Sequence, residues 1–268
     1  MIDCHTHCYY SHDSKENPIN SINQAINLGL EYLAFTDHCD KDCLFVDAYK
    51  NKIRQIDLPS YFNEINALKE QFKNKIEIGV GIECGFMTQA TPIYEDILKT
   101  YSTDIIINSV HLVDFIDCYY REYFEKKTKE EAYLNYIKSI RSSLDVPYQY
   151  DTVAHIGYVS RKAIYEDKMF KYSDFRDEID DILKTIILKG KALEINSHAE
   201  TTGDISLPNS EIIKRYFELG GELITFGSDA HISSKICYMY NDISQMLKNI
   251  GFKYVFKYLS HKPIACKL

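Results

Sequence analysis

The sequence predicts an α/β fold in which parallel strands alternate with helices. Short apolar runs rich in β-branched residues recur along the chain, and a longer amphipathic segment separates each run from the next. Strand–helix–strand units of this kind are right-handed and build a parallel sheet. From this pattern alone, the sheet either closes into a barrel or stays open with helices on both faces.

The predicted elements follow one another in a regular order. The strands are Met1–Cys4, Tyr32–Thr36, Ile76–Ile82, Asp104–Val110, Asp151–Ala154, Ala192–Ile195 and Glu222–Phe226. The helices cover residues 19–28, 60–74, 91–99, 128–143, 173–189 and 209–219. Because a helical segment separates consecutive strands, each strand can pair with the next one in the same direction.

Signals at the ends of the helical segments support these boundaries. Ser60 and Ser173 are predicted N-caps, and Pro59 and Pro208 lie where helices often begin. Three helical segments are directly followed by a glycine, as is common at helix C-termini, namely Gly29, Gly190 and Gly220.

The last part of the chain continues the same domain. Residues 241–250 show a helical pattern, and Tyr254–Tyr258 is a short predicted strand. The sequence contains no linker, internal repeat or low-complexity segment. We therefore expect a single domain over residues 1–268.

The composition argues against several classes of protein. The 268 residues include 31 Lys+Arg and 39 Asp+Glu, a formal net charge of −8, and no basic run that would bind duplex nucleic acid. No stretch reaches the roughly 20 apolar residues that a membrane span needs, and the N-terminus shows no secretory signal. We expect a cytoplasmic protein whose 8 cysteines remain thiols.

Histidines and acidic residues follow the predicted strands at their carboxyl ends. In chain order they are His5 and His7, Asp37 and His38, Glu83, His111, His155, His198, and Asp229 and His231. The carboxyl ends of parallel strands lie on one face of the sheet, so we expect these side chains to meet there. Imidazoles and carboxylates gathered in this way bind divalent zinc, iron or manganese. Alternate residues of a strand point to the same side, which allows His5 and His7 to bind one ion.

These motifs resemble those of the polymerase and histidinol phosphatase (PHP) superfamily. The matching segments are Asp3–His7, Thr36–His38, Glu83, His111, His155 and Gly227–His231. The segment Ser11–Ser14 is most similar to the histidinol-phosphate phosphatase branch. The resemblance implies a distorted (β/α)7 barrel of the TIM type, with a metal site at the carboxyl ends of its strands.

The resemblance also implies a trinuclear centre of divalent metal ions. The first ion would be held by His5, His7, Glu83 and Asp229, the second by Glu83, His111 and His155, and the third by Asp13, His38 and His231. Glu83 would then bridge the first two ions. His12 and Asp13 are adjacent and only one of them can fill the position after the first motif; the spacing favours Asp13.

A centre of this kind suits hydrolysis of a phosphate monoester. Two ions about 3.5–4 Å apart share a hydroxide that attacks phosphorus, and they neutralise the phosphoryl oxygens. Arg161 follows His155 closely enough to reach the same face, and a guanidinium binds phosphate through two hydrogen bonds. The resemblance leads us to expect a second phosphate-binding arginine, but this chain has His198 near its place. The expected catalytic residues are Glu83, Asp229, Arg161 and His198.

The resemblance implies a metal-dependent phosphomonoesterase that acts on L-histidinol phosphate in histidine biosynthesis. One alternative is a phosphoesterase of the same superfamily acting on another small ester or on nucleic-acid ends, and another is a non-catalytic metal-binding scaffold. The sequence has no glycine-rich nucleotide motif, so we expect no nucleotide cofactor. The charged, aromatic segment 119–129 is either a solvated loop or a lid over the site.

Overall fold

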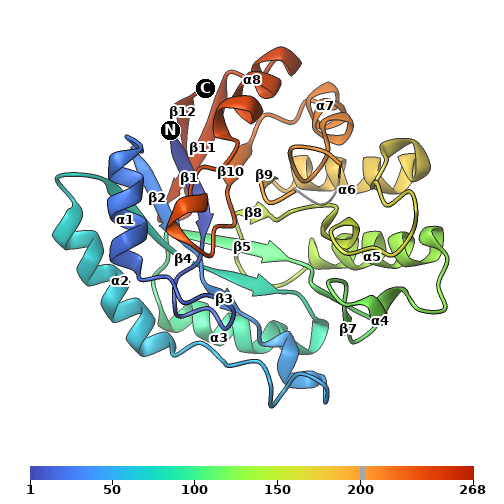
Figure 1. Ribbon diagram of the computed structural model, residues 1–268, viewed down its shortest axis with the longest axis horizontal. Helices are drawn as coiled ribbons and strands as arrows, with labels where there is room; N and C mark the ends of the chain where they lie inside the picture. The colour runs from blue at the N-terminus through green and yellow to red at the C-terminus, as the bar shows by residue number, and fades with distance from the viewer. Residues whose placement is uncertain (200–202) are drawn as a thin grey trace.

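The chain forms a barrel of parallel strands surrounded by helices (Figure 1). The structure is a computed structural model and describes residues 1–199 and 203–268. The strand order is β1 (Ile2–Thr6), β2 (Tyr32–Phe35), β4 (Glu77–Gly85), β5 (Ile105–Ser109), β8 (Thr152–Val153), β9 (Ala192–Asn196) and β10 (Ile224–Gly227). Every neighbouring pair in this order is parallel. All seven strands therefore lie close to their predicted positions.

The first and last strands come together just beyond the ends of the regular sheet. The backbone N–H of His7 donates to the carbonyl of Ala230 at 2.9 Å. The N–H of Asp229 donates to the carbonyl of His5 at 2.8 Å. These bonds nearly close the barrel, so the barrel expected from the resemblance is confirmed and the open sheet is excluded.

The helices lie outside the strands and bury one face against them (Figure 1). They are α1 (Pro18–Asn27), α2 (Leu58–Phe72), α3 (Thr91–Thr100), α4 (Arg121–Phe124), α5 (Lys129–Ser143), α6 (Arg176–Leu188), α7 (Ser210–Glu218) and α8 (Tyr240–Ile250). In α7 the buried side chains are Ile212, Ile213 and Tyr216, at the spacing of one helical face. The glycines predicted to end α1, α6 and α7 have positive φ angles of 73°, 61° and 90°.

Two predicted N-caps are wrong. Helix α2 begins at Leu58, because the side chain of Asp57 accepts the backbone N–H of Ser60 and caps the helix. Helix α6 begins at Arg176, and Ser173 lies in the 3-10 turn that precedes it. In both places a residue with good capping chemistry lies within three positions of the true start, which is the usual uncertainty of a helix boundary.

Short elements that the sequence did not predict surround the carboxyl ends of the barrel. They are β3 (His38–Cys39), which pairs with β4, and the hairpin formed by β6 (Leu112–Val113) and β7 (Ile116–Asp117). Helix α4 lies within the segment 119–129. These pieces are too short for a periodic pattern to reveal them.

A C-terminal hairpin covers the opposite, amino-terminal end of the barrel. It consists of β11 (Tyr254–Leu259) and β12 (Lys262–Lys267), which pair antiparallel. Tyr32, at the start of β2, donates its hydroxyl to the carbonyl of Tyr258 at 2.8 Å. Strand β12 was not predicted because it contains Pro263, which is tolerated there because β12 is an edge strand. The hairpin therefore covers the end of the barrel that lies opposite the histidine-rich carboxyl ends of the strands.

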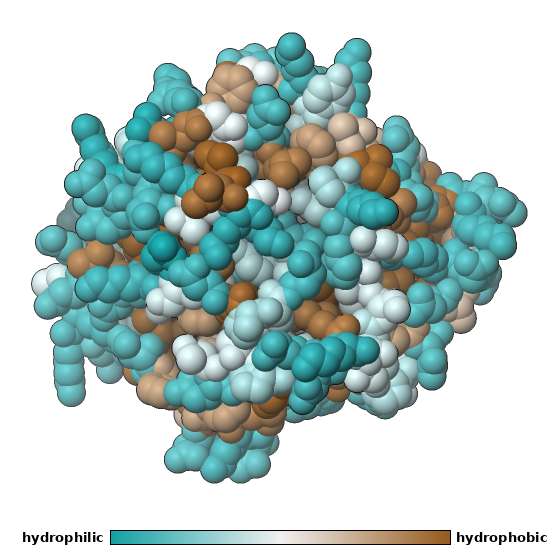
Figure 2. Space-filling view, turned by 180° about the vertical axis from the view of Figure 1, so that it is seen from behind, coloured by the Kyte–Doolittle hydropathy of each residue, from teal (hydrophilic) through white to brown (hydrophobic). Residues whose placement is uncertain are grey.

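The molecular surface seen from behind is mainly hydrophilic, with hydrophobic side chains in separate patches (Figure 2). Within the described residues, no helix combines the length and the apolar character needed to cross a membrane.

Candidate metal centre

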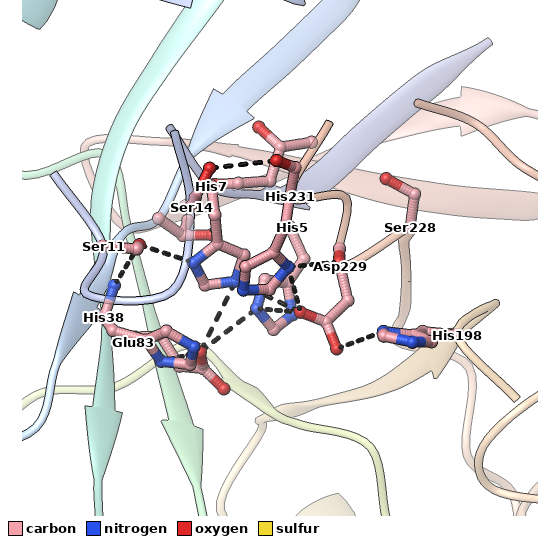
Figure 3. A network of polar contacts seen from close by, with 12 residues as sticks. His5, His7, Ser11, Ser14, His38, Glu83, His198, Ser228, Asp229 and His231 are labelled. Carbon is pink, nitrogen blue, oxygen red and sulfur yellow. Dashed lines mark hydrogen bonds and ion pairs between the residues drawn. The ribbon is translucent and has the colours of Figure 1, made fainter. Parts of the chain in front are cut away.

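The carboxyl ends of the strands bring all nine predicted metal ligands together. Figure 3 shows His5, His7, His38, Glu83, Asp229 and His231 among them. Three groups of donors have their ligand atoms within 4.8 Å of one another: His5, His7 and Asp229; His38, Glu83 and His111; and His7, His38 and His231. Residues more than 200 positions apart in the chain therefore share one site.

The first predicted group is centred on the His-x-His motif of β1. The Nε2 atom of His7 lies 3.2 Å from Oδ1 of Asp229, and Nε2 of His5 lies 3.7 Å from the same oxygen. Both imidazoles also face Oε2 of Glu83, at 3.4 Å from His5 and 3.6 Å from His7. Two imidazole nitrogens and two carboxylate oxygens therefore surround one point. Four donor atoms are typical of a zinc site.

The carboxylate of Glu83 faces two groups of histidines. Its Oε1 lies 2.9 Å from Nε2 of His155 and 3.3 Å from Nε2 of His111. Its Oε2 faces His5, His7 and the Nδ1 of His38, which is 2.9 Å away. This placement suits a carboxylate that bridges two ions.

The third predicted group favours Asp13 over His12. Oδ2 of Asp13 lies 3.1 Å from Nε2 of His231 and 3.7 Å from Nε2 of His38. The side chain of His12 instead faces Asp40, with Nδ1 at 3.3 Å from Oδ2. Asp13 is thus the neighbour that completes a group with the two histidines.

Several buried polar atoms in this site make no hydrogen bond within the described part of the chain, although some approach one another. They are Nε2 of His5, His7 and His231, Nδ1 of His38, and Oε2 of Glu83. A single buried polar atom without a partner costs about 1–3 kcal/mol. Their convergence on one small volume fits bound divalent ions, which would satisfy all of these lone pairs.

Neighbouring groups hold the opposite nitrogens of the same rings. Nδ1 of His7 lies 2.9 Å from the hydroxyl of Ser11, which donates to Asp37 at 2.7 Å. Nδ1 of His231 lies 2.9 Å from the backbone carbonyl of Asp229, and Nδ1 of His5 contacts Glu194. Such contacts orient a metal-binding imidazole and direct its other nitrogen at the ion.

The surroundings of two of the predicted ligands, Glu83 and His7, keep these side chains in the form that binds cations. Burial opposes ionisation of Glu83, but the neighbouring His38 and His5 hold its pKa well below its usual range. Burial and the neighbouring His231 and His38 lower the pKa of His7 to about 3. A carboxylate that stays ionised and an imidazole that stays neutral are both in the form that coordinates metal.

Arg161 lies at the edge of the centre, where a phosphate oxygen could reach it. Its Nη2 donates to Oδ2 of Asp229 at 2.9 Å and to Oδ1 of Asn196 at 3.3 Å. Its Nε donates to the backbone carbonyl of His198 at 2.9 Å. The imidazole of His198 lies 3.5 Å from Oδ2 of Asp229 (Figure 3). It is 46% exposed and lines the cavity, so it can contact a ligand there.

A cavity of about 520 Å³ opens directly beside the metal centre. Asp13, His231, Arg161 and His198 line one part of it. The rest of its wall includes the acidic side chains Asp40, Asp42 and Asp117 and the aromatic side chains Tyr49, Tyr119 and Tyr158. The start of the segment 119–129 therefore borders the cavity, which is large enough for a small phosphate ester.

Sequence reasoning missed the residues that support the ligands from behind. These are Glu194 and Asn196 of β9, and Ser11 after β1. Glu194 and Asn196 are two positions apart at the end of a strand, so their side chains point to the same side, the inside of the barrel. This spacing was the signal that could have indicated them. The pattern did not indicate which ligand each would contact, because those partners lie on other strands.

Comparison with known proteins identifies the family. Residues 3–198 match the model of the PHP domain. The chain belongs to the PHP domain family. Among PHP domain proteins, the histidinol-phosphatase of Lactococcus lactis is 32% identical over 252 residues, covering 94% of this chain and 91% of that protein. A probable histidinol-phosphatase of Clostridium acetobutylicum is 31% identical over 259 residues, which cover 96% of each chain.

Solved structures of two such proteins have the same fold. The Lactococcus lactis histidinol phosphate phosphatase, in complex with zinc, L-histidinol and phosphate, matches with a TM-score of 0.88 and 30% identity, covering 98% of each chain. A putative histidinol phosphatase from Listeria monocytogenes matches with a TM-score of 0.79 over 90% of this chain and 99% of that one. At 20% identity, the latter supports the barrel only.

Proposed function

We propose that this chain is a metal-dependent phosphomonoesterase that hydrolyses L-histidinol phosphate to L-histidinol and phosphate in histidine biosynthesis. The observation that carries the proposal is the arrangement around Glu83, whose two oxygens face separate groups of histidines beside an open cavity. The names of the relatives and the ligands of the Lactococcus lactis structure agree with this substrate.

The proposed centre holds three divalent ions of zinc, iron or manganese. The ligands would be His5, His7, Glu83 and Asp229 for the first ion, Glu83, His111 and His155 for the second, and Asp13, His38 and His231 for the third. Such ions activate water and neutralise the phosphoryl oxygens when they are bound. A location in the cytoplasm and a single domain over residues 1–268 remain predictions from the sequence.

The protein's own residues hold the ester in place. Arg161 binds the phosphoryl group, because its guanidinium is fixed at the edge of the centre by Asp229 and Asn196. His198 contacts the phosphate from the open side of the cavity. The acidic and aromatic wall formed by Asp40, Asp117 and the tyrosines suits the cationic, aromatic part of histidinol.

Phosphate release from L-histidinol phosphate, other small monoesters and single-stranded DNA tests the proposal. We expect a clear preference for L-histidinol phosphate and loss of at least 100-fold in activity for Glu83→Gln, since this change removes the charge shared by two donor groups. Glu70→Gln, on an exposed face of α2, serves as the matched control. Equal activity on all esters would indicate another substrate, and a metal-loaded protein active on none would support the scaffold alternative.

A further inference from the structure

Glu194 on β9 is a buried carboxylate that contacts the metal centre from behind. Its Oε1 lies 2.6 Å from Nδ1 of His5. Its Oε2 accepts the backbone N–H of His155 at 2.8 Å. Only 1% of Glu194 is exposed, so water does not compete for these contacts. One side chain therefore supports two of the predicted ligands, which come from different parts of the barrel.

The contact with His5 determines which ring nitrogen carries the proton. An ionised carboxylate only accepts hydrogen bonds, so Nδ1 of His5 must be the donor. The lone pair of the neutral ring then lies on Nε2, the buried atom that faces Glu83 and Asp229. The tautomer imposed by Glu194 is the one that binds a metal ion.

The backbone of β10 leaves room for this contact. A Cβ atom at Gly227 would lie 2.5 Å from Oε1 of Glu194 and 2.7 Å from Cβ of His5. Both distances are shorter than a carbon atom allows, so a side chain at this position would push Glu194 and His5 out of place.

Asn196 continues the contact from Glu194 to the phosphate-binding side. Its Nδ2 donates to Oε2 of Glu194 at 3.1 Å. Its Oδ1 accepts from Nη2 of Arg161 at 3.3 Å and from the backbone N–H of His198 at 2.8 Å. Because a carboxylate only accepts and a guanidinium only donates, the orientation of the amide between them is fixed.

We propose that Glu194 is a positioning residue that couples the metal centre to the phosphate-binding arginine, holding His5 directly and Arg161 through Asn196. This inference rests on the proposed function. Glu194 and Asn196 together hold the imidazole of His5 and the guanidinium of Arg161 at a fixed separation.

Glu194→Gln tests the first arm of the proposal. If the amide nitrogen of the glutamine faces His5, it donates to Nδ1 and the ring proton moves to Nε2. If it faces His155 instead, it meets two groups that also donate, the backbone N–H of His155 and Nδ2 of Asn196. We expect zinc affinity, measured by titrating zinc chloride into the metal-free full-length protein, to fall 10- to 100-fold. The visible absorption of the cobalt-loaded variant should also change. Glu77→Gln is the matched control, since Glu77 pairs with Lys257 at the opposite end of the barrel.

Asn196→Leu tests the second arm. We expect KM for L-histidinol phosphate to rise about 10-fold, because the support of Arg161 is lost. Zinc affinity should fall far less than in Glu194→Gln, because the direct contact between Glu194 and His5 remains. A folded Glu194→Gln protein with wild-type zinc affinity and cobalt spectrum would overturn the proposal, as would an unchanged KM in Asn196→Leu. If Glu194→Gln does not fold, the Asn196→Leu result decides alone.

The two proposals fail in different ways. If the wild-type protein binds zinc but releases no phosphate from any ester, the proposed function is wrong. The zinc titration and the cobalt spectrum still test the contact between Glu194 and His5 in that case.

Discussion

Asp229 and Arg161 form an ion pair at the wall of the cavity, beside the candidate metal centre. Oδ2 of Asp229 accepts from Nη2 of Arg161 at 2.9 Å, while Oδ1 faces Nε2 of His7 at 3.2 Å. Burial opposes ionisation of Asp229, but His5 and Arg161 hold its pKa well below its usual range. The carboxylate therefore stays charged and serves a metal ligand group and the guanidinium at once.

Replacing Arg161 by Ala should raise KM and lower kcat together. In the proposed function the guanidinium contacts the phosphoryl group in both the bound substrate and the transition state, so kcat/KM for L-histidinol phosphate should fall about 100- to 1,000-fold. Steady-state kinetics of the metal-loaded variant measures this. Arg141→Ala is the control, since Arg141 pairs with Asp145 and Asp181 on the outer surface. An unchanged kcat/KM would show that Arg161 does not bind the substrate.

Removing the metal should lower the thermal stability as well as the activity. Within residues 1–199 and 203–268, several buried polar atoms of the metal-free centre make no hydrogen bond. A ligand that binds only the folded state, at 1,000 times its Kd, adds about 4 kcal/mol to the free energy of unfolding. For a chain of this size we expect Tm to rise by about 10 °C when zinc is added after chelation. Differential scanning calorimetry measures the shift. A Tm that does not depend on zinc would contradict the centre.

The order of strands and the position of the site followed from the sequence because both are encoded locally. Each strand is a largely apolar run, and residues at its carboxyl end or within two positions beyond it point into the common opening, as His111 after β5 and His155 after β8 do. Parallel topology then places these ends on one face, so no knowledge of distances was needed to group them.

The supporting contacts could not be predicted in the same way. Glu194 and His5 are 189 positions apart, and their contact depends on the register of β9, on the closure of the barrel and on the absence of a side chain at Gly227. The position of His261 shows the same dependence. It lies 2.8 Å from Asp151, at the amino end of β8, because the turn between β11 and β12 carries it under the barrel. Each partner depends on elements that have no local signal.

The His261–Asp151 contact should make stability depend on pH. The hydrogen bond to Asp151 raises the pKa of His261 above its unfolded value near 6.5, although burial opposes the shift. The stabilisation is therefore fully present below about pH 6.5 and is lost as the pH rises through the folded pKa. We expect His261→Gln to lower Tm by about 2–3 °C at pH 6, for a loss of about 1 kcal/mol, and by less at pH 9. A difference in Tm that grows with pH would contradict this assignment.

His198→Ala should weaken phosphate binding without removing metal. The imidazole of His198 is 46% exposed in the cavity wall and lies 3.5 Å from Oδ2 of Asp229, on the side of the carboxylate that also binds Arg161. We expect KM to rise about 10-fold for both L-histidinol phosphate and p-nitrophenyl phosphate, with the zinc content unchanged. The second ester has a leaving group that departs without protonation. A loss of kcat confined to L-histidinol phosphate would instead identify His198 as the proton donor to the leaving oxygen. Wild-type kcat and KM on both esters would show that His198 is a loop residue without a role in the reaction.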